Sequence, residues 1–239
     1  FGIYCIYADY LLIALSFSLC FLIFSKNLFL RIFSLINFFV LFICFLYHYS
    51  RGAWVAFIAG CVFILFLKKR KIVLFLLIIF MMSFLLLPHF KERFSSLFSI
   101  VEDSSWKQRL ILQRAGFIMF FSSPLTGIGP DNYKNCLKNL NYPEKFKVNS
   151  SVWHPHNVYL QVLIEEGILG FFSFLGIIFV FLKEALKRIK SISNVYFISL
   201  FMGILSVLIR EMTNCGILSG FVIPTYFWFL LGLISNFLK

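Results

Sequence analysis

Long hydrophobic stretches alternate with short polar segments along almost the whole chain. A membrane-spanning helix needs about 20 apolar residues, with a range of about 17–25. Seven stretches approach this length and predict an all-α polytopic membrane protein with about seven transmembrane helices. These stretches are residues 1–24, 32–49, 52–67, 72–87, 158–182, 195–209 and 220–238.

The same pattern divides the chain into three parts. Residues 1–87 hold four of the predicted spans, and residues 158–239 hold the other three. Residues 88–157 form one long polar segment between them. The chain begins with Phe1 inside an apolar stretch, so we expect further N-terminal spans to precede it.

Basic residues in the short loops indicate the orientation. The clusters at residues 68–71 and 183–190 are separated by two predicted spans, and the positive-inside rule places both in the cytoplasm. Residues 88–157 then form a large extracytoplasmic, periplasmic loop. Its own basic residues carry little weight, because long loops cross the membrane largely regardless of charge.

The composition agrees with a membrane protein. The chain is 61% hydrophobic and 13% charged, whereas soluble domains are about 45–50% apolar and about 25% charged. The formal net charge of +12 comes mostly from residues that flank apolar stretches, so we expect membrane lipids and no nucleic acid as partners. The six cysteines form no C-x-x-C motif, and we expect buried free thiols. A disulfide between Cys136 and Cys215 is the less favoured alternative.

One helix is expected inside the polar segment. A capping box at its start predicts a helix over residues 105–121. Leu110 and Phe117 are seven residues apart and share a face, as do Lys107 and Arg114. This spacing predicts an amphipathic helix that lies on or against the membrane.

Two histidines stand just before the fifth predicted span, in the sequence His154-Pro155-His156-Asn157. A zinc site usually needs about three or four ligands, and no plausible set is nearby, so we expect no metal. A helix start offers free N–H groups to an anion such as phosphate, and an imidazole there is a candidate general base. The structural alternative is that the histidines only cap the mouth of a membrane helix.

The arginines suggest a second kind of chemistry. Arg51 follows an apolar stretch, where it either snorkels to the membrane surface or holds a phosphate group. Arg109 and Arg114 have the same two interpretations, a solvated basic face or a pyrophosphate clamp. Arg210 with Glu211 is most simply a self-compensating pair at the membrane interface.

Acidic residues in the second half of the chain have more than one interpretation. Glu165 and Glu166 lie inside the fifth span, where charges usually face a cavity or a partner. We expect the residues from Val158 onward to form a partly buried first turn before the true span. An acid/base role for either glutamate is the weaker alternative. Asp131 is interpreted as a turn residue.

Taken together, these residues resemble the O-antigen ligase and polymerase superfamily of bacterial membrane proteins. Three blocks within residues 49–182 carry the resemblance. The first block is S-R-G-A-W at residues 50–54. The second block is Arg109, followed by P-L-T-G-I-G at residues 124–129 and by Tyr133. The third block is H-N at residues 156–157, followed after nine residues by G-I-L-G at residues 167–170.

The resemblance implies a type C glycosyltransferase-like membrane fold and a metal-independent, inverting glycosyltransferase without a cofactor. Such enzymes move a glycan from a polyprenyl diphosphate carrier to an acceptor hydroxyl, on the periplasmic face of the bacterial inner membrane. Carried over by position, His156 is the expected general base. Arg51 and Arg109 are expected to bind and neutralise the diphosphate.

The resemblance also implies further substrate contacts and an acceptor. The expected substrate-binding residues are Arg114, Arg210, Asn157, Gly127, Gly129 and Tyr133. The expected acceptor is the lipid A core, as in an O-antigen ligase of lipopolysaccharide biosynthesis. Two alternatives stay open: a polymerase, which uses a carrier-linked glycan as acceptor, and a transporter of lipid-linked sugars, which needs no base.

Overall fold

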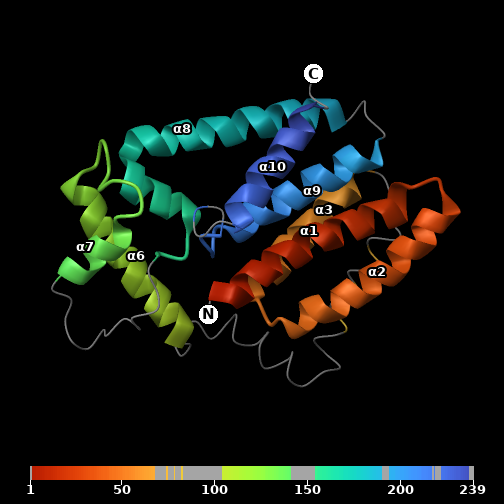
Figure 1. The fold of residues 1–239 in the computed structure, drawn as a ribbon, viewed down its shortest axis with the longest axis horizontal. Helices are drawn as coiled ribbons and strands as arrows, with labels where there is room; N and C mark the ends of the chain where they lie inside the picture. Colours follow the sequence, from red (N-terminus) through yellow and green to blue (C-terminus); the bar gives the residue numbers. More distant parts are fainter. Residues whose placement is uncertain are drawn as a thin grey trace. The chain divides into compact units, whose positions relative to one another are not determined.

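The computed structural model describes residues 2–67, 104–140, 154–189, 194–216 and 222–236, and the single residues 74, 78, 82 and 218. Every regular element in this part of the chain is an α-helix (Figure 1). The all-helical prediction is therefore confirmed for the described residues. The basic cluster at 68–71 lies outside them, as does most of the predicted span at 72–87.

Six helices correspond to predicted spans, and two belong to the polar segment. The six are α1 (Gly2–Phe24), α2 (Leu28–Tyr47), α3 (Arg51–Phe66), α8 (Val158–Ile189), α9 (Val195–Arg210) and α10 (Val222–Asn236). The two are α6 (Ser104–Ser122) and α7 (Tyr133–Asn139). Three helices are long and apolar enough to cross a membrane, namely α1 over Tyr7–Phe24, α2 and α8; α3 and α9 are apolar but shorter.

The chain divides into two compact units. Unit 1 contains Phe1–Phe98, Ala185–Arg210 and Ser219–Lys239. Unit 2 contains Ser99–Glu184 and Glu211–Leu218. The first block lies in unit 1, and the second and third blocks lie in unit 2.

Helix α9 forms the centre of unit 1. It packs against α1, α3 and α10, and its side chains are buried along almost its whole length. Close packing against α3 requires Gly60, because a Cβ there would lie 2.7 Å from Ser206 Oγ. Small residues that let helix backbones approach closely are typical of membrane helix packing.

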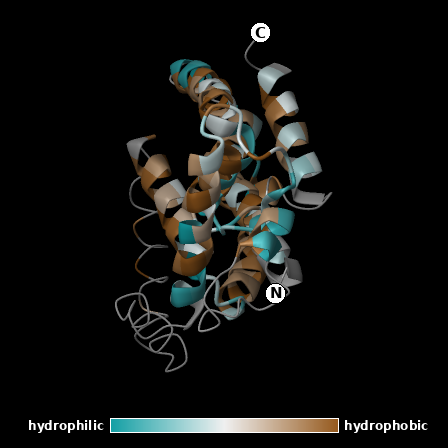
Figure 2. Cartoon of the chain, turned by 90° about the vertical axis from the view of Figure 1, so that its left-hand side faces the viewer, coloured by the Kyte–Doolittle hydropathy of each residue, from teal (hydrophilic) through white to brown (hydrophobic). Residues whose placement is uncertain are grey.

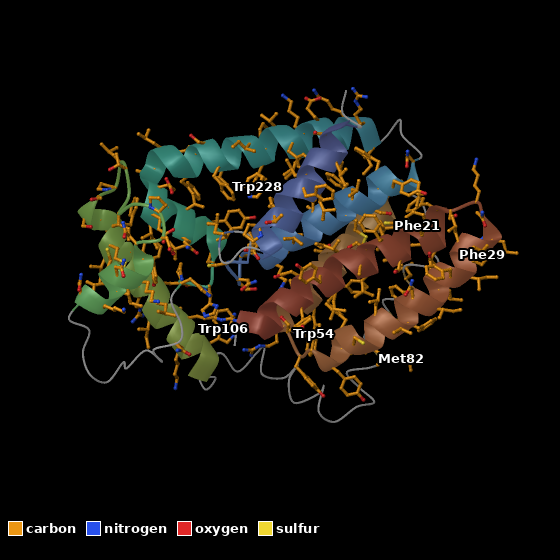
Figure 3. The ribbon with its side chains drawn as sticks, in the orientation of Figure 1. Phe21, Phe29, Trp54, Met82, Trp106 and Trp228 are labelled. Carbon is orange, nitrogen blue, oxygen red and sulfur yellow. The ribbon has the colours of Figure 1, made fainter. Side chains whose placement is uncertain are left out.

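The outer side of α2 is apolar and exposed. Phe29 is 74% exposed and points away from the helix (Figure 3), and Ile36 is 61% exposed. Hydrophobic residues continue along the helices in Figure 2, whereas hydrophilic ones gather mainly near helix ends and connections. Such a surface is unfavourable in water and suits a lipid environment.

Helix α2 begins four residues earlier than the predicted residue 32, because Asn27 Oδ1 accepts hydrogen bonds from Phe29 N (2.9 Å) and Leu30 N (3.3 Å).

Helix α6 packs its inner side into the core of unit 2. Leu112, Ala115 and Met119 are buried there against residues of α7 and α8. The sequence predicted that Leu110 and Phe117 share a face of this helix and that Lys107 and Arg114 share a face, and both pairs are exposed. Lys107, Leu110, Arg114 and Phe117 are all exposed on one side, because steps of three and four residues keep them in one stripe.

Helix α8 consists of two segments joined at Gly167. This residue has φ 68° and ψ −169°, far from helical values, and the ribbon changes direction there (Figure 1). Glycine tolerates this geometry because it has no Cβ. The first segment, from Val158 to Glu166, is thus separate from the longer apolar segment that follows, in agreement with the predicted first turn before the true span.

Candidate functional site

The glycine-rich loop of the second block docks on the break in α8. A helix break leaves carbonyl groups before it and N–H groups after it without helical partners. The loop supplies partners for both sets through four backbone hydrogen bonds. These run from Ile128 N to Ile164 O (3.0 Å), from Gly129 N to Glu165 O (2.9 Å), from Ile168 N to Pro124 O (2.9 Å) and from Leu169 N to Leu125 O (3.4 Å).

The glycines at this junction are required by its close backbone contacts. Gly127 has φ 72°, and a Cβ on it would overlap the backbone of Glu165. A Cβ on Gly167 would overlap the carbonyl group of Leu125. Gly129 also has a positive φ, of 91°. The packing alone therefore accounts for these glycines, while the substrate contacts expected of Gly127 and Gly129 stay predictions.

Glu165 and Tyr133 connect α8 to α7. The buried Glu165 carboxylate accepts hydrogen bonds from Tyr133 N at the start of α7 (3.2 Å) and from Gln161 Nε2 (3.2 Å). Tyr133 is itself buried, and its hydroxyl donates to Leu112 O at 2.6 Å. Both residues therefore hold the helices of unit 2 together. Glu166 is exposed.

His154 and His156 lie together in the turn before α8. Their ring centroids are 4.4 Å apart, with the rings nearly perpendicular at 73°. The backbone of His156 has φ 52°, in the left-handed region that few side chains adopt. The Nδ1 atom of each ring is buried and has no hydrogen-bond partner among the described residues. The turn therefore presents imidazole atoms that accept or donate no hydrogen bond within the described part of the chain.

Contacts from three directions hold this turn. Asn157 Oδ1 accepts from Leu160 N at 3.1 Å and so caps the start of α8. Val158 N donates to Glu211 O at 3.0 Å, and Gln113 Nε2 on α6 donates to Pro155 O at 3.4 Å. The predicted helix mouth is thus present, with Asn157 as its cap.

Cys215 is a further neighbour of the turn that the sequence did not reveal. Burial raises the pKa of its thiol well above the usual value, and the charge of Glu211 acts in the same direction. Hydrogen bonds from the backbone N–H groups of Asn157 and His156 act in the opposite direction. The loop after α9 therefore packs against the histidine turn, a contact across more than 50 residues of sequence that no local pattern indicates.

The electrostatic surroundings keep both histidines neutral. Burial lowers the pKa of His156 to about 3, with further contributions from His154 and from the positive charge of Arg109. Burial and Arg109 also lower the pKa of His154. The structure thus brings Arg109 and His156 into one electrostatic environment. Arg114 lies on the exposed side of α6 instead.

The first block lies in unit 1, where Arg51 is the first residue of α3. The sequence suggested that Arg210 pairs with Glu211, which stays a prediction, and the structure shows another partner of Arg210 in unit 1. The buried Arg210 forms an ion pair with Asp9 of α1, and its Nη1 donates to Ser50 Oγ at 3.1 Å. Asp9 was missed by the sequence reasoning, although a carboxylate inside an apolar stretch is a signal for such a partner.

The described residues show no candidate metal site. Within them, no group of three or more His, Cys, Asp or Glu side chains has an arrangement that could hold a metal ion. The described cysteines, Cys136 and Cys215 among them, form no disulfide with one another.

These features define a helical membrane protein with a half-buried histidine pair and an arginine near a broken helix. The sequence profile of the O-antigen ligase family matches residues 36–175, more than half of the chain, and the chain belongs to this family. The matched region contains all three blocks. No curated protein matches the chain significantly. Family membership indicates a role in glycan transfer, with a lipid-linked glycan and an acceptor as partners in general.

Proposed function

We propose that this protein is an O-antigen ligase-type glycosyltransferase of the bacterial inner membrane. It moves a glycan from a polyprenyl diphosphate carrier to a hydroxyl of the lipid A core, on the periplasmic face. The observation that carries the proposal is the neutral imidazole of His156, held in a strained turn beside Arg109. Strained backbone conformations of this kind cluster at functional sites.

In this proposal His156 is the general base. The acceptor hydroxyl gives its proton to the imidazole while its oxygen forms a bond to the anomeric carbon of the glycan. The bond between that carbon and the diphosphate oxygen breaks, and the polyprenyl diphosphate leaves with the electron pair. Attack from the face opposite the leaving group inverts the anomeric configuration. A positioned base typically contributes ~10²–10⁴-fold to the rate.

Arginines stabilise the leaving group in this proposal. Negative charge develops on the diphosphate in the transition state, and fixed positive charges lower the energy of that state. Arg109 and Arg51 take this role, because a guanidinium keeps its charge and matches phosphate oxygens with two donors. The influence of Arg109 on the pKa of both histidines supports its assignment. The exposed Arg114 remains a secondary contact.

The test is glycan transfer by the purified protein in proteoliposomes that contain the lipid-linked donor. We expect His156→Ala to lower transfer by at least ~100-fold, the scale of a lost general base, while donor binding persists. His154→Ala is the matched control in the same turn and should retain most of the rate. A His156→Ala variant that transfers glycan at nearly the normal rate would remove His156 from the role of base.

The acceptor distinguishes the ligase from its rivals. Lipid A core and a second carrier-linked glycan are supplied separately with the same donor. Product on lipid A core supports the ligase, and product only on the second carrier identifies a polymerase. If no new glycosidic bond forms with either acceptor while the donor crosses the membrane, the protein is a transporter.

A further inference from the structure

Three helices of unit 1 meet at one buried ion pair. Asp9 lies near the start of α1, and Arg210 is the last residue of α9. The Arg210 Nε donates to Asp9 Oδ1, and both side chains are almost inaccessible to solvent. A third member, Ser50, precedes α3 and accepts from Arg210 Nη1 at 3.1 Å. Arg210 therefore links α1, α9 and the start of α3.

The hydroxyl of Ser50 is diverted from its usual role. Ser50 is the N-cap residue of α3, with extended backbone angles, φ −86° and ψ 100°. A serine here usually accepts a hydrogen bond from an N–H group of the first helical turn. Ser50 makes no such bond, whereas Asn27 does so for α2. The capping oxygen of α3 is engaged by Arg210 instead.

The backbone beside Ser50 is also unusual. Tyr49 has φ 54°, one of three non-glycine residues with a positive φ among the described residues. The other two are Asp131 and His156, which lie in or beside the second and third blocks. Such conformations persist only where neighbouring contacts enforce them. The bond from Arg210 to Ser50 lies directly after the strained residue and directly before Arg51.

We propose that Asp9, Arg210 and Ser50 form a clamp that positions Arg51 for the diphosphate of the lipid-linked donor. Asp9 orients the Arg210 guanidinium, which fixes Ser50 through a planar donor group. Ser50 in turn sets the direction in which Arg51 leaves the first turn of α3. Asp9, Arg210 and Ser50 are positioning residues in this arrangement, so Arg210 acts through Arg51 and not on the substrate. This inference rests on the phosphate-binding role of Arg51 in the proposed function.

The clamp is tested first without any ligand. Hydrogen exchange is measured on the peptide covering residues 47–54 of the purified protein in nanodiscs. We expect Ser50→Ala and Asp9→Asn to speed exchange there by about tenfold, the size of one lost hydrogen bond to a charged group. Ser16→Ala is the matched control, because Ser16 is a buried serine of the same unit whose hydroxyl donates to Leu12 O of its own helix. Equal protection in all variants would overturn the clamp.

The link between the clamp and Arg51 is tested by measuring the affinity of the protein for farnesyl diphosphate and, for comparison, for farnesyl monophosphate. Ser50→Ala and Arg51→Lys should each weaken diphosphate binding by about tenfold. The double variant should bind no more weakly than Arg51→Lys, because Ser50 acts through Arg51. Additive losses in the double variant would overturn the positioning role.

The outcomes separate this inference from the proposed function. If Arg51→Lys binds farnesyl diphosphate normally while Ser50→Ala speeds exchange, the clamp stands and the phosphate role of Arg51 is wrong. If Arg51→Lys weakens binding and Ser50→Ala behaves like Ser16→Ala in both measurements, the phosphate role stands and the clamp is wrong.

Discussion

His156 combines two features that are each unfavourable in isolation. A left-handed backbone at a non-glycine residue costs of order 1–3 kcal/mol, and burial makes the charged imidazole unfavourable. The strained backbone is stabilised by contacts from α6, from the cap of α8 and from the loop after α9. The neutral ring that results can accept a proton. Its low pKa makes it a weak base until a negative charge approaches Arg109.

The pH dependence of transfer follows from this arrangement. With a pKa of about 3 in the free protein, His156 stays unprotonated well below its ordinary range, so kcat/KM should stay level from about pH 8 to about pH 5. A bound diphosphate offsets the charge of Arg109 and raises the pKa of His156. As the pH is lowered, kcat should therefore begin to fall at a higher pH than kcat/KM does.

His154 provides a second check on the same pKa. Its positive form lowers the pKa of His156, so His154→Gln should move the acidic limb of kcat/KM upward without abolishing transfer. Steady-state rates between about pH 2 and about pH 8 measure the acidic fall of both kcat and kcat/KM. If kcat and kcat/KM both fall at the same pH, near the ordinary pKa of a histidine, this result would contradict the lowered pKa of His156.

At the scale of elements, the second and third blocks form one structural joint. The loop at residues 124–129 supplies hydrogen-bond partners on both sides of the break at Gly167. The break in turn lets Glu165 reach the start of α7. The spacing of nine residues between the H-N pair and Gly167 therefore equals the length of the first segment of α8, which separates the histidine turn from the joint.

We expect Gly167→Ala to destabilise unit 2 strongly. Its φ of 68° disfavours any Cβ, and the Cβ would overlap the carbonyl group of Leu125. The backbone penalty alone is of order 1–3 kcal/mol, because only glycine commonly adopts a positive φ with an extended ψ. Gly176→Ala in the same helix is the matched control, because nothing lies within 4 Å of its added Cβ, and alanine favours a helix by about 1 kcal/mol over glycine.

Thermal unfolding in detergent compares the two variants. Gly167→Ala should unfold at a clearly lower temperature than the unmodified protein, and Gly176→Ala at the same or a higher temperature. Equal midpoints for the two variants would mean that the joint does not require a glycine at residue 167.

At the scale of the whole molecule, the two units have different kinds of exterior. The outer side of α2 in unit 1 is a continuous apolar surface, as expected of a membrane-embedded helix. In unit 2, the exposed side of α6 carries the basic Lys107 and Arg114 together with large apolar residues, namely Leu110, Phe117, Ile118 and Phe121. The exposed side of α6 in unit 2 is therefore mixed in polarity, whereas that of α2 in unit 1 is mainly apolar.

A charge placed on the outer side of α2 tests the membrane assignment. Ile36 is exposed near the middle of this helix, so Ile36→Asp would be nearly neutral in water. An aspartate at the centre of a membrane helix costs about 2.5–3.5 kcal/mol. We therefore expect Ile36→Asp to lower the amount of protein inserted into membranes, as measured by quantitative blotting of the membrane fraction.

The control introduces the same charge outside the predicted spans. Asn139 is exposed at the end of α7, and Asn139→Asp should insert normally. Equal insertion of both variants would argue against lipid contact along α2.

Local patterns predicted the elements of this protein well. Apolar stretches located six of the described helices, and the helix predicted over residues 105–121 agrees with α6 to within one residue at each end, although Ser105 lies inside α6 and not at its cap. The order of the three blocks was enough to identify the family, which the match over residues 36–175 confirms. These features depend on hydrophobic period and length, which are properties of neighbouring residues.

The partners of the polar residues were decided by tertiary structure. Arg210 pairs with Asp9 across about 200 residues of sequence, and Cys215 packs against the turn of His156. Sequence alone determined which charged residues and glycines stand at the ends and breaks of apolar helices. Only the packed structure decided what each one contacts, because a buried polar group must find whichever partner the fold brings close, however distant in the chain.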